Sequence, residues 1–179
     1  FIVIWEVTQA CDLACVHSRA EALPWRDSRE LSTEEGKKLI DQIAQFGSPL
    51  FVITGGDPLK RPDLFELIDY AVAKGLRTTL TPSGTRLMTP EVIQRLKEHG
   101  LSRLAVSLDG AGAKVHDEFR KVDGSFDWTI GSIRRAREVD LPVQINSTVC
   151  KLNIDDFDAL AELIKTLDIA LWAVFFLVP

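Results

Sequence analysis

Residues 50–58 read LFVITGGDP and contain the pattern that decides the fold. Residues 50–54 are a short run of apolar and β-branched residues, which is typical of a strand buried on both faces. Gly55 and Gly56 then end the run, because paired glycines mark a turn. The sequence therefore predicts a buried strand whose carboxyl end opens directly into a glycine-rich turn.

Amphipathic stretches lie on both sides of this strand. Upstream, Ser32 and Glu35 have the spacing of a capping box, and a helix is expected over about 33–46. Downstream, Pro62 suits the first turn of a second helix, which Gly75 closes. The alternation continues, so that five strand–helix units precede a sixth strand. The expected strands are 1–7, 50–54, 76–81, 104–108, 143–149 and 171–178, the other helices are expected over 89–100, 128–139 and 155–167, and a long loop is expected after 110.

Strands that are apolar on both faces and alternate with helices form a parallel sheet covered by helices. Right-handed crossovers allow two such architectures, an open flavodoxin-like sheet and a curled partial barrel, and spacing alone does not separate them. In both architectures the chemistry lies at the carboxyl ends of the strands. Polar and glycine-rich segments occur at these ends, namely residues 11–18, 55–58, 83–84, 107–110 and 146–148.

The 179-residue chain has an ordinary globular composition, with 46% hydrophobic and 26% charged residues, and one domain over 1–179 is expected. The net charge of −5 and the absence of a basic block argue against a nucleic-acid partner. No apolar run reaches the roughly 20 residues that a membrane span needs, so no membrane partner is expected. The chain starts and stops in strand-like sequence, which suggests a fragment with further material at both ends.

Cys11, Cys15 and Cys150 are the three cysteines, an odd number that does not suggest a secreted disulfide framework. A reduced, cytoplasmic setting is therefore expected. Cys11 and Cys15 lie in the loop that leaves the first strand, and thiolates suit iron–sulfur clusters or zinc. Structural thiols remain the alternative interpretation, because cysteine is often a small buried residue. Cys150 is interpreted as a core or loop thiol.

The segment from Cys11 to Ser18, CDLACVHS, resembles the signature of the radical S-adenosylmethionine (SAM) superfamily, in which three cysteines are separated by three and then two residues. In that family the cysteines bind three irons of a [4Fe-4S] cluster, and SAM binds the fourth iron. Cys11 and Cys15 match the first two cysteines, and Ser18 stands at the position of the third. A serine hydroxyl is a harder and much less acidic ligand than a thiol, so we expect impaired cluster assembly and little or no turnover.

The resemblance extends over nearly the whole chain. Residues 55–58 are similar to the Gly-Gly-Glu-Pro motif that contacts the methionine amino group, with Asp57 one methylene shorter than the usual glutamate. Ser107 and Arg120 match family positions that contact the cofactor, and the arginine fork suits the methionine carboxylate. By position alone, Ser83 and Asn146 are expected at the ribose and Val178 at the adenine. The full set of expected SAM-binding residues is Gly55, Gly56, Asp57, Pro58, Ser83, Ser107, Arg120, Asn146 and Val178.

The resemblance implies an α/β fold, a partial (βα)6 TIM-like barrel with parallel strands that stops after strand six. It is most specific to the peptide-modifying branch of the family. It implies an enzyme that uses the cluster to cleave SAM to a 5′-deoxyadenosyl radical, which abstracts hydrogen from a small-molecule or peptide substrate. A flavodoxin or ferredoxin is implied as the electron donor.

Two other interpretations stay open. One is a non-catalytic α/β binding module that has kept the scaffold and lost the cluster. The other is an unrelated barrel hydrolase or aldolase-type enzyme, which is disfavoured because no serine–histidine–acid order and no lysine at a strand end stands out. Lys60 and Lys74 are interpreted as surface charge, and His116 as a structural residue.

Overall fold

The computed structural model describes residues 1–13, 15 and 23–176. The strands are β1 (Ile2–Glu6), β2 (Leu50–Thr54), β3 (Arg77–Leu80), β4 (Arg103–Ser107), β5 (Val143–Val149) and β6 (Leu171–Phe176). The helices are α1 (Thr33–Gln45), α2 (Leu64–Ala73), α3 (Pro90–Glu98), α4 (Ala113–Arg120), α5 (Ser125–Glu138) and α6 (Phe157–Lys165), with 3-10 turns η1 (Pro58–Lys60) and η2 (Ile154–Asp156). Of the helices in these ranges, none is both long and apolar enough to cross a lipid bilayer.

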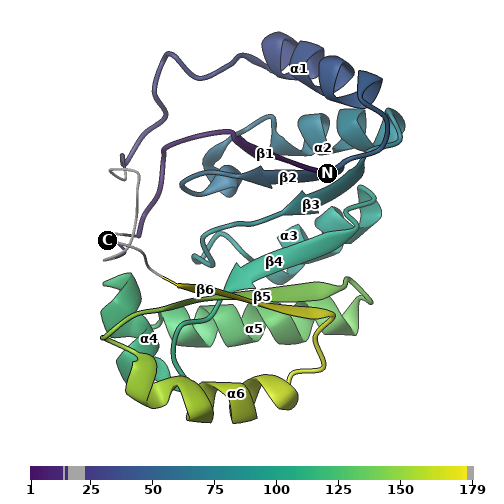
Figure 1. Ribbon diagram of the computed structural model, residues 1–179. Helices are drawn as coiled ribbons and strands as arrows, with labels where there is room; N and C mark the ends of the chain where they lie inside the picture. The colour runs from purple at the N-terminus through teal and green to yellow at the C-terminus, as the bar shows by residue number, and fades with distance from the viewer. Residues whose placement is uncertain (14, 16–22, 177–179) are drawn as a thin grey trace.

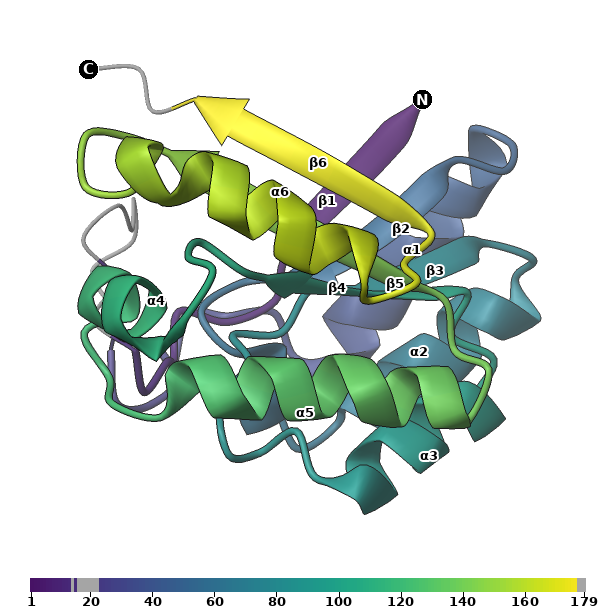
Figure 2. The same ribbon diagram turned by 90° about the horizontal axis from the view of Figure 1, so that it is seen from below.

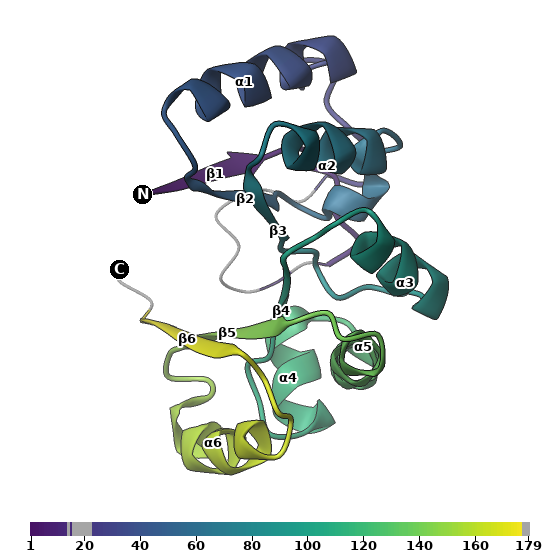
Figure 3. The same ribbon diagram turned by 90° about the vertical axis from the view of Figure 1, so that its right-hand side faces the viewer.

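The six strands form one parallel sheet in the order β1-β2-β3-β4-β5-β6 (Figure 1). A flavodoxin-like sheet reverses its strand order and carries helices on both faces. Here the order is sequential, and right-handed crossovers then place every helix on the same, convex side. The turned views in Figures 2 and 3 show the sheet curling with the helices outside it. The prediction of a partial (βα)6 barrel is confirmed, and the open-sheet alternative is wrong.

The hydrophobic core lies between the sheet and its helices. Phe51, Ile53, Leu104 and Ile145 point to the convex side and have no exposed surface. Because successive side chains of a strand point to opposite faces, the intervening residues line the concave side. No helix of the described part covers that side (Figure 3). Within the described residues, the half-barrel is therefore packed on the outside and open on the inside.

The helix ends follow the expected chemistry. The Ser32 side chain accepts from the Glu35 N–H, and the Glu35 carboxylate accepts from the Ser32 N–H at 2.9 Å, so the predicted capping box is present. The Thr89 side chain caps α3. Gly75 and Gly100 follow α2 and α3 with φ values of 78° and 79°, a left-handed conformation that favours glycine. These local signals account for the accurate prediction of the first helices.

The loop expected after residue 110 was wrong, because the chain forms α4 there. The buried side chains of α4 are His116, Phe119 and Arg120. Only one of the three is apolar, so the helix has no apolar stripe for sequence reasoning to detect. α5 also begins earlier than predicted, at Ser125 rather than near residue 128.

Candidate functional site

The carboxyl ends of the parallel strands meet at one edge of the half-barrel, which we call the mouth. The loop carrying the two cysteines leaves β1 there, and the Gly-Gly turn leaves β2. Ser83 follows β3, Ser107 ends β4, and Asn146 lies beside Ser107 in β5. The structure thus brings these predicted residues to one edge, whereas Ser18 and Val178 lie outside the described residues.

The backbone closes the base of the cysteine loop. Ala10 and Leu23 form an isolated parallel bridge. The Cys11 N–H donates to the Leu23 carbonyl at 2.9 Å, and the Leu23 N–H donates to the Gln9 carbonyl at 3.2 Å. The two ends of the loop are therefore held side by side where it begins.

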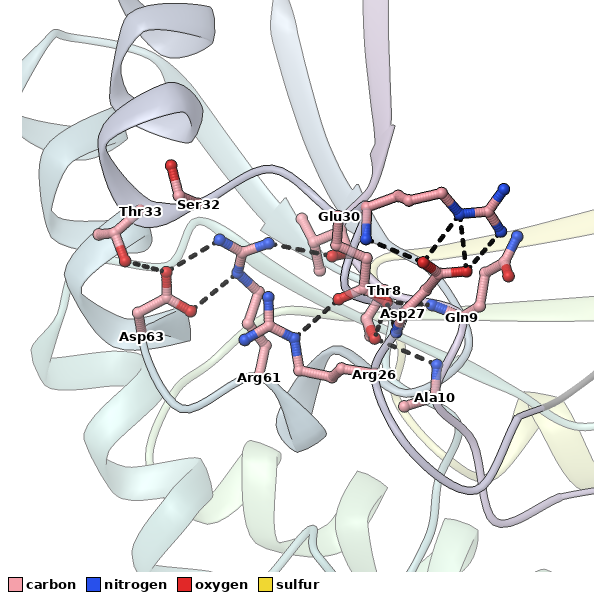
Figure 4. A network of polar contacts seen from close by, with 12 residues as sticks. Thr8, Gln9, Ala10, Arg26, Asp27, Glu30, Ser32, Thr33, Arg61 and Asp63 are labelled. Atoms are coloured by element: carbon pink, nitrogen blue, oxygen red, sulfur yellow. Dashed lines mark hydrogen bonds and ion pairs between the residues drawn. The ribbon is translucent and has the colours of Figure 1, made fainter.

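Glu30 reinforces this closure with its side chain (Figure 4). Its Oε1 accepts from the Thr8 hydroxyl at 2.7 Å and from the Gln9 N–H at 3.0 Å, while its Oε2 accepts from Arg26 Nε at 2.7 Å. Burial alone would raise the pKa of Glu30, but these hydrogen bonds hold it below its ordinary value. The ionised carboxylate connects the chain entering the cysteine loop to the chain leaving it.

Arg61 holds the end of β1 from the convex side (Figure 4). Its side chain is fully buried, its Nη1 donates to the Val7 carbonyl at 3.1 Å, and its Nε pairs with Asp63 at 2.8 Å. The Thr33 hydroxyl donates to Asp63 at 2.6 Å, which ties α1 to the same group. Sequence reasoning missed this network and that of Glu30, because their members come from separate segments and look like ordinary surface residues.

The glycines of the Gly-Gly turn are required by contact with the cysteine loop. Gly55 has φ of 149°, which side chains rarely allow. A Cβ on Gly56 would lie 2.5 Å from the Ala10 carbonyl oxygen and 2.7 Å from that of Gln9. The Gly56 N–H also donates to the Thr8 carbonyl at 2.7 Å. The backbone that these glycines approach is that of the cysteine loop.

Asp57 shapes the same turn from a fully buried position. One carboxylate oxygen accepts from the Thr85 hydroxyl at 2.7 Å, and the other accepts from the Leu59 N–H at 3.2 Å. This second bond caps η1, which starts at the buried Pro58. Burial raises the pKa of Asp57. Both oxygens are thus occupied by the protein itself.

Lys60 contacts both ends of the cysteine loop. Its ammonium group pairs with Asp12 and donates to the Pro24 carbonyl at 3.2 Å, and its side chain is only 18% exposed. The charge of Lys60 is therefore partly exposed, as the surface interpretation expects, and it also ties the helical turn η1 to the loop. The surface interpretation also holds for Lys74, because Lys74 and its partner Asp41 are 40% and 39% exposed.

Cys11 lies against Ser83, in the loop after β3. Its Sγ is 3.2 Å from Ser83 Oγ and accepts from the Leu13 N–H at 3.4 Å. The Ser83 hydroxyl donates to the Gly56 carbonyl, so the thiol acts as the donor to Ser83. Burial raises the pKa of the Cys11 thiol. Ser83 therefore joins the cysteine loop to the Gly-Gly turn.

Arg120 approaches the second cysteine from α4. It is 7% exposed, its Nη1 donates to Cys15 Sγ at 3.6 Å, and its Nη2 pairs with Asp109 at 2.5 Å. Burial lowers the pKa of Arg120, but Asp109 and Cys15 raise it above its ordinary value overall. Its Nε is buried and has no partner within the described residues. The mouth thus contains a fixed cation with one spare donor.

His116 is a second buried polar residue of α4, one turn before Arg120. It is buried, and its Nδ1 accepts from the Asp109 N–H at 3.1 Å. Burial, followed by the nearby Arg120 charge, lowers the pKa of His116 to about 4. The imidazole is therefore neutral at pH 7 and serves as a structural acceptor, in line with the sequence interpretation.

Ser107 and Asn146 are register partners on the concave face. Asn146 Oδ1 accepts from Gln144 Nε2 at 2.7 Å. This hydrogen bond uses the carbonyl oxygen of the amide, so the Asn146 N–H donors are available to other acceptors. Both side chains are half-buried at the mouth.

The donor set fits an iron–sulfur cluster in part. Cys11 and Cys15 are free thiols at the same mouth, and the Arg120 cation beside Cys15 suits an anionic thiolate. Across residues 1–13, 15 and 23–176, no three His, Cys, Asp or Glu side chains form a group that could hold a metal ion. The third ligand would have to come from the loop position of Ser18, which offers a hydroxyl oxygen instead of a thiolate.

Known sequences of one family are similar to this chain over most of its length. The sequence profile of the Radical SAM superfamily matches residues 5–164. The AdoMet-dependent heme synthase of Methanosarcina barkeri is 43% identical over 178 residues, which cover 99% of this chain and 51% of that protein. The mycofactocin maturase MftC of Mycolicibacterium smegmatis is 37% identical over 160 residues, covering 89% of this chain and 40% of that protein. The chain thus spans about half the length of these relatives or less.

Among solved structures, Streptococcus suis SuiB bound to S-adenosylmethionine superimposes with a TM-score of 0.84. The match covers 99% of this chain and 40% of that chain at 20% sequence identity. At this identity the likeness shows a common fold, which agrees with the half-barrel described above.

Proposed function

The chain belongs to the radical SAM superfamily, a family of enzymes that use SAM and an iron–sulfur cluster, and from this premise we propose that its mouth binds a [4Fe-4S] cluster through Cys11 and Cys15 and binds SAM beside it. When bound, the cluster supplies the electron that splits SAM into methionine and a 5′-deoxyadenosyl radical able to remove a substrate hydrogen. The residues of this chain hold the loop, orient SAM and limit water at the mouth.

The unpartnered Nε of Arg120 is the observation that carries this proposal. A buried N–H without an acceptor costs free energy, and a carboxylate supplies the missing acceptor. The methionine part of SAM carries a carboxylate, and the guanidinium can bind it as a fork. Asp109 pairs with the Arg120 guanidinium and fixes its position, and Arg120 Nη1 donates to Cys15. SAM bound at Arg120 would therefore lie next to the cysteine loop.

The other SAM contacts are proposed from their places at the mouth. The carbonyl groups of the turn at 55–58 face the methionine amino group, and Ser107 and Asn146 serve the ribose. Ser83 acts mainly by holding Cys11 against Gly56. Val178 is proposed at the adenine.

The substrate class follows from the more similar relative. The 43% identity to a heme synthase favours an iron tetrapyrrole or a precursor of one. A peptide is the second candidate, supported by the 37% identity to a mycofactocin maturase. A flavodoxin or ferredoxin is proposed as the electron donor, and the three free cysteines suit a reducing cytoplasmic setting.

Ser18 is proposed to limit cluster assembly, and Ser18→Cys tests this. Restoring the thiolate should raise iron and sulfide content after anaerobic reconstitution and restore 5′-deoxyadenosine formation from SAM with dithionite. The measurements are iron analysis, electron paramagnetic resonance and chromatography of 5′-deoxyadenosine. Equal cluster content and equal SAM cleavage in both chains would show that Ser18 is not limiting. No cluster in either chain would favour the non-catalytic binding module.

Arg120→Ala tests the SAM site. Loss of a charge-assisted hydrogen bond should weaken SAM binding by about 1.5–3 kcal/mol in anaerobic calorimetry. Lys114→Ala is the matched control, because Lys114 is an exposed cation on the same helix. Unchanged SAM affinity in a folded Arg120→Ala chain would remove Arg120 from the site.

A further inference from the structure

Apart from Glu6 at the carboxyl end of β1, the concave face of the half-barrel has a mixed apolar and basic character. In β4, Leu104 and Val106 point to the helices and are fully buried, so Arg103 and Ser107 point to the concave side. In β3, Leu80 belongs to the convex core, which places Arg77 on the concave side as well. Two arginines thus line the amino-terminal half of the open face.

Neither of these arginines has a carboxylate partner among the described residues. Arg103 of β4 is the register partner of Thr79 in β3. Thr79 lies two residues after Arg77, so the two arginines are on adjacent strands. The ion pairs found in the described part of the chain include neither of them. Two cations on one face without an acid partner attract an anion to that face.

Apolar side chains flank the arginines on both sides. Ile2 and Ile4 of β1 are 60% and 64% exposed, and Leu171 and Phe175 of β6 are 43% and 52% exposed. All four are on the concave face by strand alternation and register. These exposed apolar side chains border the open face at both of its edges, and exposed apolar groups on one face offer surface that a ligand can cover. The occupant must therefore be largely apolar and also carry negative charge.

A hydrogen-bonded relay fixes the direction of Arg103. Its Nη1 donates to Gln144 Oε1 at 3.0 Å, and Gln144 Nε2 donates to Asn146 Oδ1 at 2.7 Å. The rise of a strand places Arg103 about 13 Å from Ser107 at the mouth. A molecule held at Arg103 would therefore reach the SAM site with its other end.

We propose that Arg103, together with Arg77, binds a carboxylate of the substrate inside the half-barrel, and that the substrate is a carboxylate-bearing tetrapyrrole. This inference rests on the proposed function and adds the substrate's binding determinant. A tetrapyrrole is a flat apolar ring with carboxylates on its edge. The ring matches the apolar flanks, and the carboxylates match the arginine pair.

The test titrates the chain with metal-free protoporphyrin IX, which has two carboxylates and no metal for the thiols to bind. Fluorescence reports the binding. Arg103→Gln should weaken binding about 10-fold to 100-fold, because a charge-assisted hydrogen bond is lost. Arg103→Lys should weaken it less, because the charge stays while the fork is lost. Arg77→Gln should also weaken it, whereas Arg134→Gln, an exposed arginine on α5, should not. The dimethyl ester should bind all variants alike.

The outcomes separate this inference from the proposed function. Equal protoporphyrin affinity in the Arg103 and Arg77 variants would overturn the carboxylate site and leave a tetrapyrrole substrate standing. No protoporphyrin binding by the unmodified chain, alongside normal SAM binding, would overturn both the tetrapyrrole and this site but not the SAM assignment. Tighter binding of an acidic decapeptide that Arg103→Gln abolishes would assign the face to a peptide instead.

Discussion

Asp109 connects more parts of the mouth than any predicted residue. Its Oδ2 pairs with Arg120, its Oδ1 accepts from the Thr148 N–H at 2.7 Å, and its N–H donates to His116. Its carbonyl also accepts from Asn153 Nδ2 at 2.9 Å. A buried carboxylate is tolerated only when it is paired and hydrogen-bonded, and Asp109 satisfies this condition completely. The polar segment at 107–110 places Asp109 after β4 but does not reveal this role, since the partners of Asp109 lie in α4, in β5 and in the loop after β5.

The depressed pKa of His116 makes stability depend on pH. The pKa of His116 is about 4 in the folded state, below the ordinary value of 6.5. Between these two values the imidazole is protonated in the unfolded chain and neutral in the folded chain. The neutral imidazole contributes fully to the free energy of unfolding above the unfolded-state pKa, and this contribution is lost as the pH falls towards 4. Between pH 7 and pH 5 the loss should be about 2 kcal/mol. Urea unfolding at several pH values measures it.

His116→Asn provides the comparison for that pH profile. Asparagine can still accept from the Asp109 N–H but does not titrate. The variant should have a lower free energy of unfolding than the unmodified chain at pH 7. At pH 5 the difference in free energy of unfolding between the two chains should be smaller by about 2 kcal/mol. Parallel profiles for the two chains would contradict the assigned pKa.

At the scale of elements, local chemistry identified the strands and most helices. The run at 50–54 and the capping box at 32–35 were sufficient, because each signal lies within a few residues. α4 was missed because His116 and Arg120 take positions that an apolar residue usually fills. The closure of the cysteine loop by Glu30 and Lys60 was missed because it joins segments that are distant in sequence. A sequence pattern shows the periodicity of one helix or strand, but it does not show which distant residue a side chain contacts.

Gly56→Ala tests the contact between two of these elements. The new methyl group would meet the Ala10 and Gln9 carbonyl oxygens, and backbone cannot move aside cheaply. Stability should fall by about 1–3 kcal/mol. The cysteine loop should shift, and Cys11, no longer held against Ser83, should react faster with iodoacetamide, as peptide mass spectrometry can measure.

Gly131→Ala is the matched control for that substitution. Gly131 lies within α5, and nothing lies within 4 Å of its Cβ position. Alanine should therefore stabilise the helix by about 0.5–1 kcal/mol and leave the Cys11 reaction unchanged. If both alanine variants behaved alike, close packing of the Gly-Gly turn on the cysteine loop would be refuted.

For the molecule as a whole, the sequence predicted a parallel sheet but not its curvature. The difference between a flavodoxin-like sheet and a half-barrel is strand order, and the β1-to-β6 order depends on contacts among all strands. The resemblance to the radical SAM superfamily selected the half-barrel. Physical reasoning did predict that the candidate residues meet at one edge, because parallel strands bring their carboxyl ends together in either architecture. The concave arginines Arg77 and Arg103 carried no sequence signal, since each looks like a strand-end surface charge.

The open half-barrel should also make this chain self-associate. Within the described residues, β1 pairs only with β2 and β6 pairs only with β5, so each leaves one edge unpaired. Exposed apolar residues such as Ile4 and Phe175 lie on these edge strands. Such surfaces bind other copies, and replacing one buried aliphatic contact by a charge should cost about 2 kcal/mol of association free energy. Ile4→Lys should therefore weaken self-association at least about tenfold in sedimentation velocity over a concentration series. Leu152→Lys changes an apolar residue that is 58% exposed but lies in the loop after β5, outside the edge strands, and should leave association unchanged. A chain that stays monomeric at every concentration would show that the edges are already protected.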